Sequence, residues 1–275
     1  MQPPRHQTQT LTERIASMGL RVHCALIFLF LVAPILAIVP LSFNSGSFFS
    51  YPMDGISLRW YQQAFGSHDW QLAFANSIGI GAVATLIATC LGTLAALGLS
   101  RSVFPFRSIV MPLLISPMII PIVVVAAGFY LIFSPRGLVN SYPGVVLAHA
   151  ALGTPFVVIT VTASLLSFDQ SLLRAAAGLG ARPWTMFRRV TLPLIAPAVA
   201  TGSVFAFATS FDEVIVILFI GGPEQRTVPR QMWSGIRDQI DPSILAVATV
   251  LIVFATLLFS AMNWLRGRAA AASSV

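Results

Sequence analysis

The chain is short of charged residues, has no lysine and carries only two cysteines, and each shortage excludes a class of protein. Charged residues fill 9% of the 275 positions and hydrophobic residues fill 56%, whereas a soluble domain has about 25% charged residues. This composition cannot supply a water-facing surface of ordinary size, so it excludes a soluble enzyme. Cys24 and Cys90 lie inside apolar runs, and they provide neither a disulfide framework nor a metal-binding spacing.

The absence of lysine narrows the chemistry further. All 16 basic residues are arginine, so a Walker A loop, G-x-x-x-x-G-K-[ST], cannot form in this chain. Lysine Schiff-base catalysis is excluded for the same reason. The four histidines are scattered and predict no metal site. We therefore expect a chain without catalytic residues, metal or cofactor of its own.

Apolar runs recur along the chain, and each is long enough to cross a bilayer as a helix. The first run is longer than the apolar stretch of a signal peptide, so we expect it to remain as a helix. The sequence predicts an all-α membrane protein with one six-helix transmembrane domain over 22–265, between a polar segment, 1–21, and a short tail, 266–275. The predicted spans cover about 22–41, 72–99, 109–133, 145–166, 194–220 and 244–265.

The second span carries a stripe of small side chains. Ala84, Ala88, Gly92 and Ala96 recur at every fourth residue, which places them on one face of a helix. Such a stripe lets a neighbouring helix approach closely within a membrane. We expect this face to be a contact between helices.

The arginines predict the orientation of the chain. They separate the apolar runs instead of gathering on one polar surface, so the formal net charge of +7 indicates membrane topology rather than a nucleic-acid partner. With six spans, the side that holds both termini carries 11 arginines and the other side carries five. Cytoplasmic loops carry the excess of basic residues, so we expect both termini in the cytoplasm.

The loop over 167–193, between the fourth and fifth spans, is too polar to cross a membrane and too patterned for a linker. Asp169 is suited to cap a helix start. Gly178 and Gly180 are suited to end that helix, and Pro183 fits the first turn of a second one. The pattern predicts a short helix–turn–helix on the cytoplasmic face.

The second of these short helices carries Trp184, Phe187, Arg188 and Arg189, an apolar and basic mixture that needs a covering partner. One interpretation is an amphipathic helix that lies on lipid, with its arginines toward anionic headgroups. The other is a docking element for a second protein. The residues alone favour neither interpretation.

The same loop carries a recognisable motif, Arg174-Ala175-Ala176-Ala177-Gly178-Leu179-Gly180, followed by Val190-Thr191-Leu192-Pro193. It resembles the cytoplasmic loop of binding-protein-dependent ABC importer permeases, whose pattern is E-A-A-x-x-x-G and then I-x-L-P. Arg174 stands where that family has glutamate, which is a departure. The resemblance implies a coupling helix that seats in a groove of a cytoplasmic ATPase. The implied coupling residues are Arg174, Ala175, Ala176, Gly180, Leu192 and Pro193.

The resemblance extends along most of the chain and narrows to one subgroup. The segments that carry it are 40–44 (Pro-Leu-Ser-Phe-Asn), 76–77 (Asn-Ser), 155–158 (Pro-Phe-Val-Val), 210–214 (Ser-Phe-Asp-Glu-Val) and 222–223 (Gly-Pro). They are similar to the second permease subunit of spermidine/putrescine-type transporters.

That similarity implies half of the translocation pathway of a type I importer in a bacterial inner membrane. The implied partners are a second permease, two ATPase subunits that bind ATP and magnesium, a periplasmic binding protein, membrane lipid and a small-molecule substrate. Polyamines are the expected substrate. Aminoalkyl phosphonates, opines and 4-aminobutyrate remain alternatives, and so does a proton-coupled secondary transporter.

Two adjacent acids, Asp212 and Glu213, interrupt the fifth apolar run. Charged side chains within a bilayer are costly and usually face a cavity or a partner. We expect the candidate pathway residues to be Ser210, Phe211, Asp212 and Glu213, with an acid attracting a cationic amine. The alternatives are pairing with an arginine near the outer face, such as Arg136 or Arg237, or a protonated carboxyl bonded to a partner subunit.

His149 is the titratable residue of the fourth span. A polar side chain within a bundle usually bonds across helices, and we expect that role for it. A contact with the pathway is the alternative. Two roles are also open for three phenylalanine side chains. The rings of Phe205, Phe207 and Phe211 can pack in the core, or their faces can attract a cation.

Overall fold

The computed structural model is almost entirely helical and describes residues 11–100, 106–167, 169, 171–238 and 242–272. It forms two compact units. The described part of unit 1 contains residues up to 63 together with 242–252, and that of unit 2 contains the remainder. Helix α12 (Ser243–Ala272) contributes to both units.

Unit 1 contains α1 (Leu11–Leu41) and most of α2 (Arg59–Gly66), and the loop between them is organised by Asn44. The Asn44 side-chain oxygen accepts hydrogen bonds from the backbone N–H groups of Gly46 and Asp54, at 3.2 and 3.0 Å. The backbone carbonyl oxygen of Asn44 accepts a hydrogen bond from the Trp60 indole N–H at 2.8 Å. Asn44 is buried, and these bonds satisfy polar groups that would otherwise be costly to bury.

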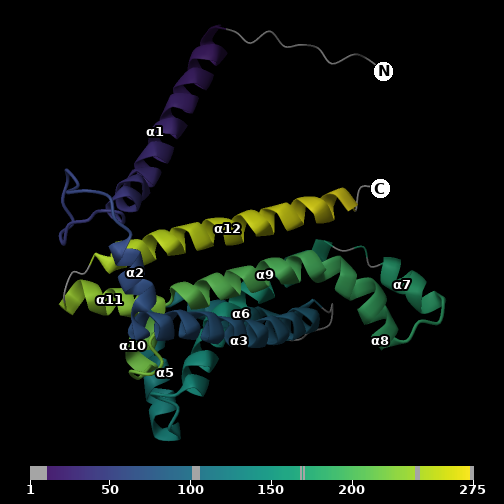
Figure 1. Ribbon diagram of the computed structural model, residues 1–275. Coiled ribbons are helices and arrows are strands. Elements are labelled where there is room, and N and C mark those ends of the chain that lie inside the picture. Colours follow the sequence, from purple (N-terminus) through teal and green to yellow (C-terminus); the bar gives the residue numbers. More distant parts are fainter. Residues whose placement is uncertain (1–10, 101–105, 168, 170, 239–241, 273–275) are drawn as a thin grey trace. The chain divides into compact units, whose positions relative to one another are not determined.

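Unit 2 is built on three long helices, α3 (His68–Leu99), α6 (Tyr142–Ser167) and α9 (Leu192–Asp212), which pack on one another (Figure 1). The shorter α10 (Ile215–Ile220) packs on α5 (Ile122–Phe133) and α6, and α11 (Val228–Asp238) packs on α3. At the other end of the bundle lie α7 (Ser171–Gly178) and α8 (Pro183–Met186). The loop and the acids singled out in the sequence therefore lie at opposite ends of α9.

Small residues set the spacing of the three long helices. The stripe of Ala84, Ala88, Gly92 and Ala96 is buried, as predicted. A Cβ at Gly92 would lie 2.7 Å from the Cβ of Val157 on α6, which is closer than side-chain atoms can pack. Only glycine permits this approach of α3 to α6.

Helices α6 and α9 run antiparallel in a regular register. On α6, His149, Gly153 and Val157 follow at intervals of four residues, and on α9 their partners Ser210, Ala206 and Gly202 follow at the same interval in reverse. A Cβ at Gly153 would lie 3.0 Å from the Cβ of Ala206, and one at Gly202 would lie 2.8 Å from the Cα of Val157. Only the His149–Ser210 pair of these three is polar.

The apolar run at 109–133 is not one straight helix. Helix α4 (Arg107–Ile119) and the segment Ile122–Arg136, which comprises α5 and a short 3-10 turn, are bent by 107° at Ile120 and Pro121. Ile120 has an extended backbone, with φ −72° and ψ 137°, which is the conformation that a following proline favours.

Among the described residues, five helices are long and apolar enough to cross a membrane, and there are six candidates if the bent pair counts as one span. The single-helix candidates are Ala16–Leu41, His68–Leu99, Tyr142–Ser167, Pro183–Asp212 and Ser243–Ala261. The fifth apolar run, predicted as one span over 194–220, consists instead of α9 and α10 with a break between them.

The spacing of α3 and α6 yields a stability prediction. Gly92→Ala is expected to lower the free energy of unfolding by about 1–3 kcal/mol, the usual cost of overpacking. Gly79→Ala on the same helix is the matched control, because nothing lies within 4 Å of a Cβ there. Thermal unfolding followed by tryptophan fluorescence in detergent measures both variants, and equal midpoints would contradict the close approach.

Candidate translocation and coupling sites

The two acids of the fifth apolar run lie at the break between α9 and α10. Asp212 is the last residue of α9, and Glu213 has an extended backbone with φ −74° and ψ 121°. The Glu213 carboxylate accepts a hydrogen bond from the N–H of Val216 at 2.8 Å. Glu213 therefore caps the first turn of α10 and satisfies a backbone donor that the break leaves without a helical partner.

Asp212 has a different environment from its neighbour. Its side chain is exposed, and it has no hydrogen-bond or salt-bridge partner among the described residues. The Arg136 guanidinium, one of its proposed partners, donates instead to the carbonyl of Ile132. Of the two acids, Asp212 is the carboxylate left available to a ligand.

Three phenylalanine rings lie beside this break. The centroids of Phe207 and Phe211 on α9 are 5.6 Å apart, and that of Phe254 on α12 lies 6.4 Å from Phe207 and 5.2 Å from Phe211. These distances are typical of packed aromatic pairs. The rings therefore pack together and line the last two turns of α9, next to Asp212.

Ser210 belongs to the core and not to the exposed side of the break. Its hydroxyl lies 2.8 Å from Nδ1 of His149 on α6, and both residues are buried. His149 is thus bonded across helices, as the sequence predicts. Of the four candidate pathway residues, Asp212 is exposed, Phe211 and Glu213 are half-buried, and Ser210 is enclosed.

The loop after α10, residues 221–227, is held by side chains far away in the sequence. The Asn76 amide donates to the carbonyls of Glu224 and Arg226 at 2.7 and 2.9 Å. Tyr142 donates to the Asn76 side-chain oxygen at 3.1 Å and to the Glu224 carbonyl at 2.9 Å. The Ser77 hydroxyl accepts from the N–H of Val228 at 2.8 Å. These bonds hold the loop against the third turn of α3 and the first turn of α6.

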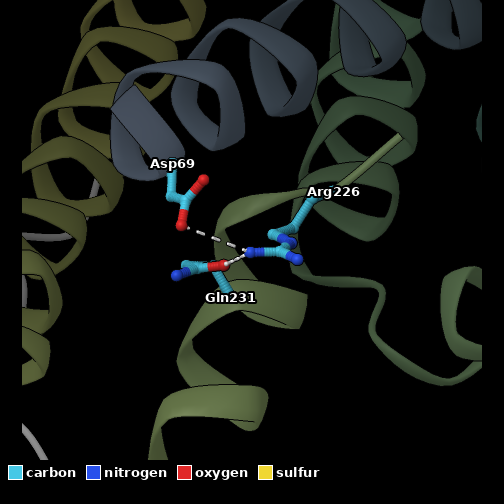
Figure 2. A network of polar contacts seen from close by, with 3 residues as sticks. All are labelled: Asp69, Arg226 and Gln231. Atoms are coloured by element: carbon cyan, nitrogen blue, oxygen red, sulfur yellow. Dashed lines mark hydrogen bonds and ion pairs between the residues drawn. The ribbon is translucent and has the colours of Figure 1, made fainter. Parts of the chain in front are cut away.

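The surface of this loop carries a second polar network (Figure 2). The Arg226 guanidinium donates to the Gln231 side-chain oxygen at 3.0 Å and lies 3.6 Å from the Asp69 carboxylate. The side chain of Asp69 is 61% exposed, and exposed ion pairs contribute little to stability. The bonds of the buried Asn76 side chain therefore hold the loop more strongly than the exposed Arg226–Asp69 salt bridge does.

The opposite end of α9 carries the predicted helix–turn–helix. Asp169 accepts bonds from the N–H and the hydroxyl of Ser171, at 2.8 and 2.6 Å, and so caps α7. These bonds hold the pKa of Asp169 below its ordinary value. Gly180 has a φ of +78°, a left-handed conformation that glycine adopts without strain. Pro183 begins α8, so the cap, turn and second helix agree with the sequence prediction.

Large apolar side chains of this segment face outward. Leu172 is 46% exposed, Leu179 is 89% exposed and Trp184 is 68% exposed. Arg174 is exposed on the same short segment. This segment therefore has exposed large apolar side chains and an exposed arginine, which the rest of the described chain does not cover.

The other residues of the predicted coupling motif lie on two helices, α7 and α9. Ala175 and Ala176 lie on α7, and Leu192 and Pro193 form the start of α9. A π-helical turn, Phe187–Thr191, joins α8 to α9 without a break in the backbone helix. The exposed segment of α7 and α8 is thus connected to α9, and through α9 to Asp212.

Comparisons with known proteins identify the class. Residues 88–270 match the family described as the inner membrane component of binding-protein-dependent transport systems. The spermidine/putrescine transport system permease protein PotC of Escherichia coli is 32% identical over 232 residues, which cover 84% of this chain and 88% of PotC. The putrescine transport system permease protein PotI of the same bacterium is 32% identical over 238 residues, with 82% of each chain covered.

A third relative belongs to a different transport system. The molybdenum transport system permease protein ModB of Mycobacterium bovis is 32% identical over 203 residues, which cover 68% of this chain and 76% of ModB. The fold is also similar to a solved bacterial ABC transporter that imports the acidic polysaccharide alginate, with a TM-score of 0.73 at 17% identity over 93% of this chain and 98% of that one.

A solved bacterial alginate ABC transporter in complex with an alginate pentasaccharide-bound periplasmic protein is also similar, with a TM-score of 0.71 at 19% identity over 93% of this chain and 96% of that one. The chain belongs to the family of inner membrane components of binding-protein-dependent transport systems. It is a permease subunit of an ABC importer, a transport component and not a catalytic enzyme. Family membership confirms the resemblance read from the sequence and displaces the proton-coupled alternative.

The bonds that hold the loop over 221–227 yield a prediction. It compares the contribution of the buried Asn76 bonds to stability with that of the exposed Arg226–Asp69 ion pair. Asn76→Asp removes the amide donor and places a carboxylate against the carbonyls of Glu224 and Arg226, so we expect a loss of about 1–3 kcal/mol of stability. Hydrogen exchange over 221–228 should speed up in parallel. Asp69→Asn, which removes the exposed ion pair, should change neither quantity, and an equal effect of both variants would contradict the ranking of the networks.

Proposed function

We propose that the importer built on this permease carries polyamines of the spermidine and putrescine class. The observation that carries the proposal is the exposed carboxylate of Asp212, which lies at a helix break beside aromatic rings and has no hydrogen-bond or salt-bridge partner among the described residues. A carboxylate attracts an alkylammonium group, and aromatic faces attract cations. The permeases PotC and PotI, which resemble this chain over most of its length, serve systems named for polyamines.

Identity alone does not select this substrate, because ModB has the same identity over a smaller share of the chain. The chemistry at the break favours a cation, since an exposed carboxylate repels an anion such as an oxyanion of molybdenum. Another small amine-bearing solute, such as an aminoalkyl phosphonate, an opine or 4-aminobutyrate, would use the same carboxylate and remains the second candidate.

We further propose the arrangement of the importer. The chain crosses the bacterial inner membrane six times, the bent α4–α5 pair counts as one crossing, and both termini are cytoplasmic, as the distribution of arginines indicates. A second permease subunit completes the pathway, and a periplasmic binding protein delivers the substrate. Two cytoplasmic ATPase subunits bind ATP and magnesium, which supply the energy.

In this proposal, the chain's own residues transmit movement and guide the cation. The outward-facing Leu172, Leu179 and Trp184 are covered by the ATPase, and the contact moves α7 and α8 when the ATPase closes. The π-helical turn passes this displacement to α9, because a continuous helix moves as a unit. Asp212, at the far end of α9, then changes which side of the membrane its carboxylate faces, as alternating access requires.

Loss of the carboxylate tests the pathway. In liposomes that contain the permease with its genomically neighbouring permease, ATPase and binding protein, Asp212→Asn should lower the initial rate of labelled spermidine uptake about tenfold. A contact with a charged group contributes about 1.5 kcal/mol or more, which corresponds to that factor.

Two variants serve as controls for this measurement. Asp212→Glu keeps the charge and should retain most of the uptake. Glu213→Gln should also retain it, because the amide oxygen can still accept the Val216 N–H. Uptake by Asp212→Asn at the original rate, with the complex assembled, would remove Asp212 from the pathway.

The exposed surface of the helix–turn–helix yields a separate prediction about the partner. Leu179→Asn should reduce co-purification of the ATPase several-fold, because hydrophobic side chains buried at interfaces contribute more than about 1 kcal/mol each. Leu166→Asn, at an exposed leucine outside this segment, is the control. Unchanged ATPase recovery with Leu179→Asn would favour the alternative in which this segment lies on lipid.

A further inference from the structure

We infer that the His149–Ser210 hydrogen bond is a positioning contact that fixes the rotation of the last turn of α9 and thereby the direction in which Asp212 points. This inference rests on the proposed role of Asp212 for its functional meaning. The geometry of the contact stands apart from that role. Ser210 precedes Asp212 by two residues, and no break in the helix separates them.

The His149–Ser210 bond is strongly directional, whereas the contacts around it are not. The neighbouring contacts of α6 with α9 place Gly153 against the Cβ of Ala206, and Gly202 against the Cα of Val157 and the side-chain oxygen of Thr160. Such contacts hold the helices close together, but van der Waals attraction depends only weakly on angle and so permits a small range of rotations. A hydrogen bond depends on both distance and angle, so it selects one rotation among these.

Loss of this bond would leave buried polar groups unpaired and so would raise the free energy of the folded state. His149 and Ser210 are buried at 0% and 4% exposure, so neither side chain can exchange its partner for bulk water. Nε2 of His149 is already a buried nitrogen without a hydrogen-bond partner within the described residues. A rotation of α9 by one residue, about 100°, would leave Nδ1 and the Ser210 hydroxyl unpaired as well. Unpaired buried polar groups are costly, so the observed rotation is strongly preferred.

The rotation of α9 sets the direction of Asp212 because the helix ends at that residue. Helix α9 ends two residues after Ser210, and Glu213 immediately begins the cap of α10. Asp212 therefore has no helical turn beyond it to hold its orientation. The His149–Ser210 bond, half a turn earlier, is the last polar contact from another helix along α9 before Asp212 in the described structure.

The chain supplies a matched control for the test. Ser203, seven residues before Ser210 on the same helix, also makes a 2.8 Å side-chain bond to another helix, in this case to Thr89 on α3. Ser203→Ala and Ser210→Ala therefore remove the same atom from the same helix two turns apart. A general loosening of the bundle affects both variants alike, whereas positioning of Asp212 depends on Ser210 alone.

The experiment measures the accessibility of position 212 in the assembled importer. Cys24 and Cys90, both exposed, are replaced by alanine, and Asp212→Cys provides the single thiol of this chain, whose labelling is read on the separated permease subunit. The rate of its reaction with a small cationic methanethiosulfonate reagent is then compared in the parent, in Ser210→Ala, in His149→Leu and in Ser203→Ala. Thermal midpoints of all variants are recorded, so that only folded complexes are compared.

We expect Ser210→Ala and His149→Leu to change the labelling rate by about fivefold, the factor that corresponds to loss of one net hydrogen bond. Ser203→Ala should leave the rate within twofold of the parent. His149→Asn, whose amide nitrogen can replace Nδ1, should restore most of the parental rate. Equal changes in Ser203→Ala and Ser210→Ala, or no change in any variant, would overturn the inference.

The labelling result is independent of the substrate. If Asp212→Asn still imports spermidine at the parental rate, the pathway role of Asp212 fails, and the labelling experiment still decides whether the bond positions residue 212. If Ser210→Ala labels like the parent while Asp212→Asn abolishes uptake, the positioning inference fails and the proposed function stands.

Discussion

The structure of unit 2 depends on how closely α3, α6 and α9 approach one another. Glycine and alanine at the crossing points bring backbones within a distance that no larger side chain allows. In a bilayer, where lipid is as apolar as leucine, such close packing replaces the hydrophobic effect as the force that joins helices. The few polar contacts between these helices can form because the backbones are close enough for short side chains to meet.

Much of this architecture was predictable from the sequence because it follows from the spacing and type of residues that are near neighbours in the chain. The stripe at 84, 88, 92 and 96 has helical spacing, and the cap and turn at Asp169 and Gly180 follow from the chemistry of the residues themselves. The resemblance to the family, which the motif in the same loop carried, is confirmed by the family match. These features depend on neighbours within about one or two helical turns, which is the range that a sequence pattern describes.

The features that sequence reasoning missed depend on distant residues or on a break without a local marker. The apolar run around Asp212 continues to Ile220 without a proline, so nothing in its periodicity predicted that α9 would end there. Asn76 was noted as a motif residue, but its bonds to residues about 150 positions away could not be read from spacing. Ser210 was expected near the pathway, and its enclosure follows from the register of α6 against α9.

The break between α9 and α10 has an electrostatic consequence. A helix carries roughly half a positive charge at its start and half a negative charge at its end, so the break brings an end and a start together. Glu213 offsets the positive start of α10 through its bond to Val216. The last carbonyls of α9 and the carboxylate of Asp212 then share the same sign, an arrangement that costs stability in isolation. If the proposed cationic substrate binds there, its charge would offset that repulsion, and part of its affinity would then come from the fold itself.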